Sequence, residues 1–163
     1  MLNVLVLCTG NSARSILGEA LFTALGEGRI RGFSAGSFPK GEPHPLALET
    51  LQAHGRDTAG LRSKSWDEFA APGAPEIDAV ITVCDNAAAE VCPVWPGAPV
   101  KAHWGLPDPA AIADPDAARA AFEITYAELE RRISALLDAL RGDDRTALAA
   151  ALRSIPETRG ETA

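Results

Sequence analysis

Cysteines and long uncharged runs are scarce in this 163-residue chain, and each scarcity excludes a class of protein. The three cysteines, Cys8, Cys84 and Cys92, are too few and odd in number for a disulfide scaffold. The longest segment without a charged side chain, residues 1–13, is too short to span a bilayer. Basic residues number 15 against 22 acidic ones, and the net charge of −7 argues against nucleic acid or an anionic membrane as the main partner.

The first residues also lack the basic segment that opens an export signal, so we expect a cytoplasmic protein. The length predicts a single domain, which we place at residues 1–153. The polar residues 154–163 are expected to form a flexible tail, and the protein is expected to be a monomer.

Apolar strand patterns alternate with helical patterns along the chain. Buried-strand patterns occur at residues 2–7, 30–35, 77–83 and 100–104, and helical patterns at residues 16–25, 45–54, 116–140 and 141–153. This alternation predicts an α/β fold with a four-stranded parallel sheet. Ligands bind at the carboxyl ends of the strands in such folds. Cys8 and Cys84 each follow a predicted strand, so both are expected at that edge of the sheet.

The segment that begins at Cys8 has the composition of an anion-binding loop. Backbone N–H groups at the start of a helix attract an oxyanion, and Arg14 can add a bidentate fork. The same field favours a thiolate, so we predict a lowered pKa for Cys8 and a nucleophilic role, with a hydrogen bond from Ser15. Gly10 and Asn11 suit the unusual backbone angles of a tight loop. The predicted anion-binding residues are Thr9, Gly10, Asn11, Ser12, Ala13, Arg14 and Ser15. A structural cysteine followed by an ordinary turn is the alternative.

Residues 6–15, Val-Leu-Cys-Thr-Gly-Asn-Ser-Ala-Arg-Ser, resemble the phosphate loop of the low-molecular-weight protein tyrosine phosphatase superfamily. The resemblance continues through Ser-Ala-Gly at 34–36 and His-Trp-Gly-Leu-Pro-Asp-Pro at 103–109, and covers residues 2–140. Within the superfamily the chain is most similar to arsenate reductases that pass oxidising equivalents to a small thiol protein. The resemblance implies a three-layer fold with helices on both faces of the sheet.

The same resemblance implies that Asp108 is the general acid that protonates the leaving oxygen. A helix cap or a turn residue is the alternative role for this aspartate. Related phosphatases typically continue Asp-Pro with two aromatic residues that flank an aryl substrate, whereas Ala110 and Ala111 follow here. This difference weakens the phosphatase interpretation and favours a small inorganic oxyanion.

Cys84 and Cys92, with seven residues between them, suit a reductase, because a hydrolase needs neither thiol. The resemblance implies that Cys8 attacks arsenate and that Cys84 then forms a disulfide with Cys8 as arsenite leaves. Cys92 would next attack Cys84, and the Cys84–Cys92 disulfide would be reduced by thioredoxin, glutaredoxin or a low-mass thiol. Core packing of Cys84, or a metal site formed by both cysteines and His103, is the alternative, although the close Cys-x-x-Cys pairs of structural zinc sites are absent.

Asn11, Glu19, Ser34 and Asp67 resemble the positions at which some relatives bind potassium beside the loop. No other cofactor is expected. Two further functions stay open from the sequence: a phosphatase acting on phosphoesters, and a non-catalytic oxyanion or arsenite sensor that uses the three thiols as ligands.

Overall fold

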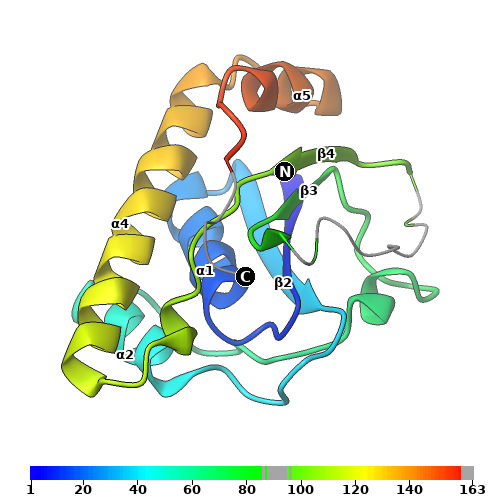
Figure 1. Ribbon diagram of the computed structural model, residues 1–163. Helices are drawn as coiled ribbons and strands as arrows, with labels where there is room; N and C mark the ends of the chain where they lie inside the picture. Colours follow the sequence, from blue (N-terminus) through cyan, green and yellow to red (C-terminus); the bar gives the residue numbers. More distant parts are fainter. Residues whose placement is uncertain (86, 88–94, 96, 159–163) are drawn as a thin grey trace.

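Four parallel strands form one sheet in the computed structural model, which describes residues 1–85, 87, 95 and 97–158 (Figure 1). The strand order is β2-β1-β3-β4. The strands are β1 (Leu2–Cys8), β2 (Ile30–Gly36), β3 (Ala79–Thr82) and β4 (Val100–His103). Cys8 is paired with Gly36 in the register of β1 and β2. The predicted four-stranded parallel α/β sheet is therefore confirmed, with β3 shorter at both ends than its sequence pattern.

The α-helices are α1 (Arg14–Gly26), α2 (Pro45–Ala53), α4 (Pro115–Ala139) and α5 (Arg145–Arg153), and the 3₁₀ helices are η1 (Trp66–Phe69) and η2 (Pro109–Ala111). Side-chain caps explain where the two C-terminal helices begin. The carboxylate of Asp114 accepts a hydrogen bond from the N–H of Ala117 at the start of α4, and Asp144 caps α5 in the same way. The last helix consequently begins at Arg145 rather than at residue 141.

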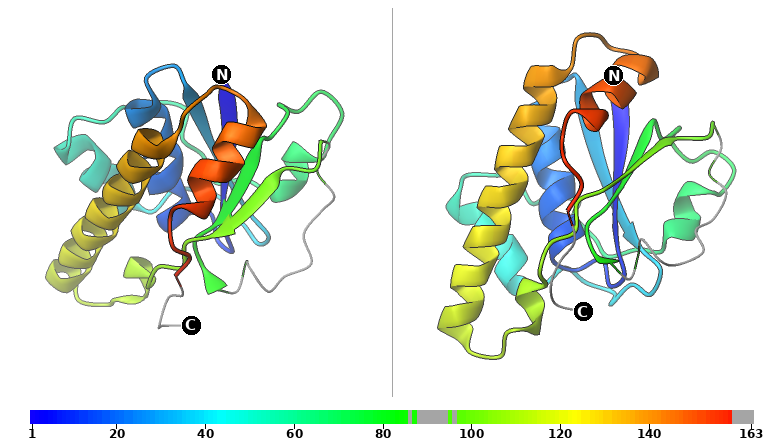
Figure 2. Two further views of the ribbon diagram at one scale, coloured as in Figure 1. Left: turned by 90° about the horizontal axis from the view of Figure 1, so that it is seen from above. Right: turned by 45° about the horizontal axis from the view of Figure 1, so that its top comes forward.

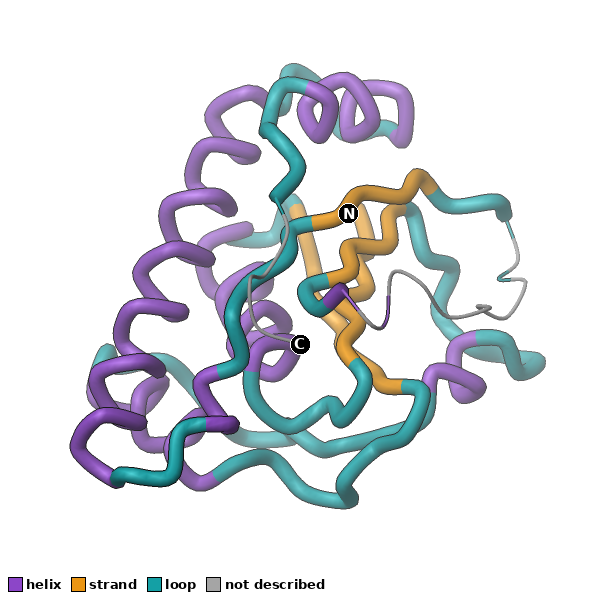
Figure 3. The backbone as a smooth tube through the Cα atoms, viewed as in Figure 1, coloured by secondary structure: helices purple, strands orange, loops and turns teal. Residues whose placement is uncertain are grey.

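The two faces of the sheet are covered unequally (Figure 2). Along β1, Val4, Val6 and Cys8 belong to the core shared with the α-helices. Leu5 and Leu7 point to the opposite face, where the core is completed by residues of η1 and by Trp95. A strand buried on both faces explains the nearly continuous apolar sequence of β1. Among the described residues, α1, α2, α4 and α5 cover one face and the short helix η1 lies on the other (Figure 3), so the predicted three layers are present and the described part of one outer layer is thin.

The segment after α5 differs from its prediction. Residues 154–158 were expected to belong to a flexible tail, but Thr158 pairs with Trp104 beyond the end of β4. The N–H of Gly105 donates to the carbonyl of Thr158 at 2.8 Å, and the N–H of Thr158 donates to the carbonyl of His103. β4 is an edge strand, and the chain satisfies backbone groups that the sheet leaves unpaired there. Thr158 therefore has backbone partners at the edge of the sheet, whereas the flexible tail stays a prediction, and residues 159–163 lie outside the described part of the chain.

Among the helices that the structure describes, none combines the length and the apolar character needed to cross a membrane. The longest of them, α4, spans 25 residues and carries many charged side chains.

Candidate active site

The loop between β1 and α1 lies at the carboxyl edge of the sheet, as the strand pattern predicts. Asn11 has φ 44°, which lies in the left-handed region that asparagine tolerates better than most residues. Gly10 has no positive φ, so the predicted reason for that glycine is wrong. Its close neighbour is the side chain of Lys40, because a Cβ at position 10 would lie 3.2 Å from Lys40 Cε.

The start of α1 has no side-chain cap. Ala13 occupies the N-cap position and offers no acceptor to the first N–H groups of the helix. The first turn of a helix has N–H groups without intrahelical partners, and they carry the positive end of the helix dipole. An uncapped helix start beside a cysteine leaves these donors available to an oxyanion.

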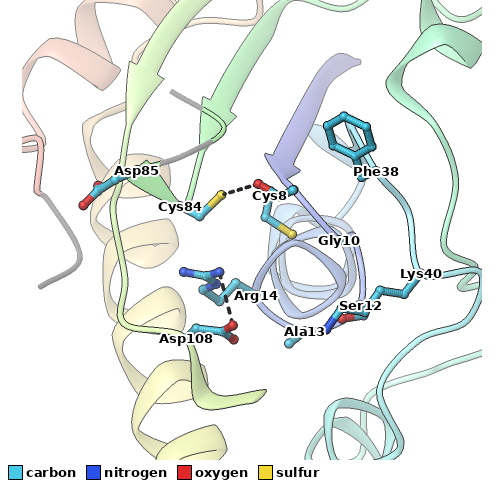
Figure 4. A pocket seen from close by; sticks show the side chains of 11 residues that line it. Cys8, Gly10, Ser12, Ala13, Arg14, Phe38, Lys40, Cys84, Asp85 and Asp108 are labelled. Atoms are coloured by element: carbon cyan, nitrogen blue, oxygen red, sulfur yellow. Dashed lines mark hydrogen bonds and ion pairs between the residues drawn. The ribbon is translucent and has the colours of Figure 1, made fainter. Parts of the chain in front are cut away.

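A pocket of about 240 Å³ opens above this loop and brings together four of the predicted catalytic residues (Figure 4). It is lined by Cys8, Thr9, Gly10, Ser12, Ala13, Arg14, Phe38, Lys40, Cys84, Asp85 and Asp108. Cys8 and Cys84 come from the ends of neighbouring strands, whereas Arg14 and Asp108 lie together on another side of the pocket (Figure 4). The remaining predicted anion-binding residues, Asn11 and Ser15, are buried behind the loop.

Ser15 and Asn11 form a hydrogen-bonded chain that ends on the nucleophile candidate. The hydroxyl of Ser15 lies 2.9 Å from Cys8 Sγ, and Asn11 Nδ2 donates to Ser15 Oγ at 2.8 Å. Because Asn11 supplies the donor to that oxygen, the Ser15 hydroxyl proton is directed to the sulfur. The predicted hydrogen bond from Ser15 is thus present.

The pKa of the Cys8 thiol is raised, contrary to the sequence prediction. Burial is the largest cause and the nearby Cys84 adds to the rise, whereas the Ser15 hydrogen bond and the charge of Arg14 lower the pKa. Arg14 has other partners: its Nη1 donates to the carbonyl of Leu106 at 2.7 Å, and Nη2 lies 3.7 Å from Asp108 Oδ2. The cation is therefore shared with a carboxylate instead of acting on the sulfur alone.

The side chain of Asp108 caps a helix and also reaches the pocket. Its Oδ1 accepts the N–H of Ala110 at 3.0 Å, which caps η2. Its Oδ2 lies beside Arg14 at the pocket. A carboxyl group held by one oxygen at a helix start, with the other oxygen in the pocket, is well placed for proton transfer to a bound oxyanion.

Cys84 is a second buried thiol in the same pocket. It is 4% exposed, its Sγ lies 3.5 Å from Thr9 Oγ1, and it accepts the N–H of Ala87 at 3.3 Å. Thr9 is the residue after Cys8, so Cys84 lies against the loop that begins at Cys8. Cys92 lies outside the described residues, and the predicted Cys84–Cys92 exchange stays a prediction.

The metal alternative finds no support in the described residues. Both ring nitrogens of His103 are engaged, Nε2 with Asp85 Oδ1 and Nδ1 with Thr82 Oγ1, each at 2.7 Å. Within the described part of the chain, no group of three or more His, Cys, Asp and Glu side chains is arranged to hold a metal ion.

The predicted potassium ligands do not fit a bound cation. Ser34 Oγ already donates to Glu19 Oε1 at 2.5 Å, and the ammonium of Lys64 lies 3.5 Å from that same oxygen. Asn11 uses its amide oxygen to accept the N–H of Lys64, and Asp67 is exposed on η1. A protein ammonium thus lies at the acidic group that a potassium ion would need.

Sequence reasoning missed Phe38 and Lys40, which come from the loop after β2. The N–H groups of Phe38 and Lys40 donate to the carbonyls of Thr9 and Gly10, each at 3.0 Å, and these bonds join the two loops. Phe38 is 74% exposed at the pocket, and Lys40 adds a cation to it. The usable signal was their position directly after the predicted second strand, at the same carboxyl edge as Cys8.

Comparisons with known proteins agree with this arrangement. Residues 3–146 match the family model described as low molecular weight phosphotyrosine protein phosphatase. An arsenate reductase of Halalkalibacterium halodurans is 33% identical over 128 residues, which cover 78% of this chain and 88% of the relative.

Two solved structures extend the likeness to three dimensions. A structure described as an arsenate reductase in the phosphate binding state aligns with a TM-score of 0.67 and 27% identity, over 85% of this chain and 98% of the other. The thioredoxin-dependent arsenate reductase of Corynebacterium glutamicum aligns with a TM-score of 0.61 and 26% identity, over 85% of this chain and 61% of the other.

Proposed function

Because this chain belongs to the low molecular weight phosphotyrosine protein phosphatase family, we propose that it uses the family's oxyanion pocket to reduce arsenate to arsenite. The relatives and solved structures named as arsenate reductases support this activity. The observation that carries the proposal is Cys84, a second thiol lining the pocket of Cys8. Hydrolysis of a phosphoester does not require a second thiol. Reduction of arsenic does, because a second thiol must form a disulfide with Cys8 as the S–As bond breaks.

In the first step, the Cys8 thiolate attacks arsenic(V), an S–As bond forms and one As–O bond breaks. Arg14 and the N–H groups at the start of α1 hold the remaining oxygens, and Asp108 donates a proton to the leaving oxygen, which departs as water. The Ser15 hydrogen bond stabilises the thiolate that attacks. Since burial raises the pKa of Cys8, this bond matters more here than it would beside an exposed thiol.

In the second step, the Cys84 thiolate attacks Cys8 Sγ. An S–S bond forms, the S–As bond breaks, and its electron pair stays on arsenic, so arsenic(V) becomes arsenic(III) and leaves as arsenite. The two thiols together lose two electrons. The contact of Cys84 Sγ with Thr9 Oγ1 at 3.5 Å supports an approach from that side.

In the third step, Cys92 attacks Cys84, Cys8 leaves as a thiolate, and the disulfide passes to Cys84–Cys92. An external dithiol then reduces it. A thioredoxin is the donor that we propose, since one of the similar solved structures is described as thioredoxin-dependent.

Arsenate-dependent NADPH oxidation in the presence of thioredoxin and thioredoxin reductase tests the proposal. The unmodified protein is expected to turn over, Cys84→Ser to release no arsenite, and Cys92→Ser to complete one turnover only. Glutathione with glutaredoxin, run in parallel, distinguishes the donors. Hydrolysis of para-nitrophenyl phosphate that survives Cys84→Ser, without arsenate-dependent oxidation in either system, would assign the chain to the phosphatases instead. Stoichiometric arsenite binding without turnover would indicate a sensor.

A further inference from the structure

Lys64 is the buried cation nearest to the anion loop that no step above uses. It is 7% exposed and lies in the segment between α2 and the 3₁₀ helix η1. Its Nζ lies 3.5 Å from Glu19 Oε1 and donates to the carbonyl of Arg62 at 2.9 Å. A buried ammonium needs such partners, because removing an unpaired charge from water is costly.

The carboxylate that pairs with Lys64 is itself fixed from α1 and β2. Glu19 lies in α1, one turn after Ser15, and its Oε1 also accepts the hydroxyl of Ser34 in β2 at 2.5 Å. Ser34 is fully buried. The ammonium, the carboxylate and the hydroxyl therefore form one cluster that ties three segments together beneath the loop.

The backbone of Lys64 connects this cluster to the nucleophile. Its N–H donates to Asn11 Oδ1 at 2.9 Å, and its carbonyl accepts the N–H of Gly36 at 2.9 Å. Asn11 in turn donates to Ser15, whose hydroxyl lies 2.9 Å from Cys8 Sγ. A shift of Lys64 would thus move Asn11 and, through Ser15, the group that stabilises the thiolate.

We propose that the ammonium of Lys64 is a tethered replacement for a monovalent cation, so that Lys64 positions the Asn11–Ser15–Cys8 chain without potassium. Two cations on one carboxylate oxygen repel each other, so Lys64 and a potassium ion exclude one another at Glu19. A tethered charge also avoids the entropy lost when a free ion is bound. Burial lowers the pKa of Lys64 while Glu19 raises it, in keeping with an ammonium that depends on this carboxylate.

The test compares potassium chloride with tetramethylammonium chloride at equal ionic strength. The readouts are the thermal midpoint and the rate of Cys8 alkylation by iodoacetamide, both in a Cys84→Ser/Cys92→Ser background. Neither readout requires arsenate, so their failure is separate from failure of the proposed reductase activity. The Lys64-containing protein is expected to give the same values in both salts.

Lys64→Met removes the charge and keeps an unbranched buried side chain. In tetramethylammonium it is expected to alkylate about tenfold more slowly, with potassium or ammonium chloride restoring most of the rate, the size expected of a coupling between two sites. Lys64→Arg should stay indifferent to potassium because it keeps the charge. Lys101→Met, at an exposed position of β4, is the matched control and should behave as the unmodified protein does.

The proposal would be overturned if potassium raised the alkylation rate of the protein that keeps Lys64 by more than about threefold, or raised its thermal midpoint. A free ion would then share the site. A Lys64→Met variant with unchanged alkylation in both salts would overturn it as well. Lys64→Met could fail to fold in tetramethylammonium chloride. Recovery of its thermal transition on adding potassium would then support the proposal. Failure of both potassium and ammonium to recover the transition would count against it.

Discussion

Replacement of Ser15 by alanine tests how the buried Cys8 becomes reactive. Ser15 Oγ lies 2.9 Å from Cys8 Sγ and accepts a hydrogen bond from Asn11 Nδ2 at 2.8 Å. A hydrogen bond to a charged group contributes roughly 1.5–3 kcal/mol. Since about 1.4 kcal/mol corresponds to a tenfold change in an equilibrium constant, Ser15→Ala should raise the pKa of Cys8 and disfavour its thiolate about 10–100-fold.

The charged form of Cys8 is the thiolate, so a hydrogen bond to it lowers the pKa. The bond stabilises the thiolate, so its loss raises a pKa that burial has already raised, and the thiolate fraction near neutral pH falls about 10–100-fold. The assay is the pH dependence of Cys8 alkylation in the Cys84→Ser/Cys92→Ser background. Single-turnover arsenate reduction should fall in parallel, provided that thiolate attack limits the rate.

Ser37→Ala is the matched control. The buried Ser37 hydroxyl has no hydrogen-bond partner among the described residues, so its removal should leave the alkylation profile unchanged. Ser15→Ala should also lower the free energy of unfolding by about 1–3 kcal/mol, because it leaves the buried Asn11 amide without its acceptor. An unchanged alkylation midpoint in Ser15→Ala, or an equal shift in Ser37→Ala, would refute the reasoning.

Three further predictions concern the acid, the loop packing and the pH dependence of stability. Asp108→Asn keeps an oxygen to cap η2 but cannot donate the acid proton, so single-turnover arsenate reduction should fall about 10²–10⁴-fold with little change in thermal midpoint; an unaffected rate would exclude the acid role. Gly36→Ala places a Cβ 2.3 Å from the carbonyl oxygen of Thr9, and urea unfolding should show a loss of at least about 1–3 kcal/mol, whereas Gly142→Ala, with its nearest contact at 3.2 Å, should be tolerated better. Because the folded-state pKa of Cys8 lies above its ordinary value, its contribution to stability is complete below about pH 9 and is lost as the pH rises through the folded-state pKa, so Cys8→Ser should flatten the alkaline limb of stability against pH.

The sequence was sufficient to predict the features that depend on residues close together along the chain. The apolar alternation predicted the parallel strands, and the strand-to-helix segment after Cys8 predicted the pocket, because a loop of this composition has the same few residues within reach of one another. The start of α4 is local in the same sense, because the carboxylate of Asp114 accepts a hydrogen bond from an N–H three residues away.

Long-range packing decided what the local pattern left open. Lys64 and Asn11 are 53 positions apart, and no spacing rule joins the ammonium of Lys64 to Glu19. The docking of Thr158 on Gly105, again 53 positions apart, depends on an edge that exists only once the sheet has formed. The upward direction of the Cys8 pKa has the same origin. The loop's local field favours the thiolate, but the degree of burial belongs to the whole core, and here burial has the larger effect.

The sequence by itself therefore predicted the nucleophile loop and its arginine from neighbours along the chain, and the family resemblance added the acid and the roles of the further thiols. Only the tertiary structure decided how these groups are tuned. It set the contact of Cys84 with the loop of Cys8, shared Arg14 with Asp108, and put a lysine where a potassium ion was predicted. Charge interactions and desolvation depend on distances through space, and these distances are set when segments remote in sequence pack together.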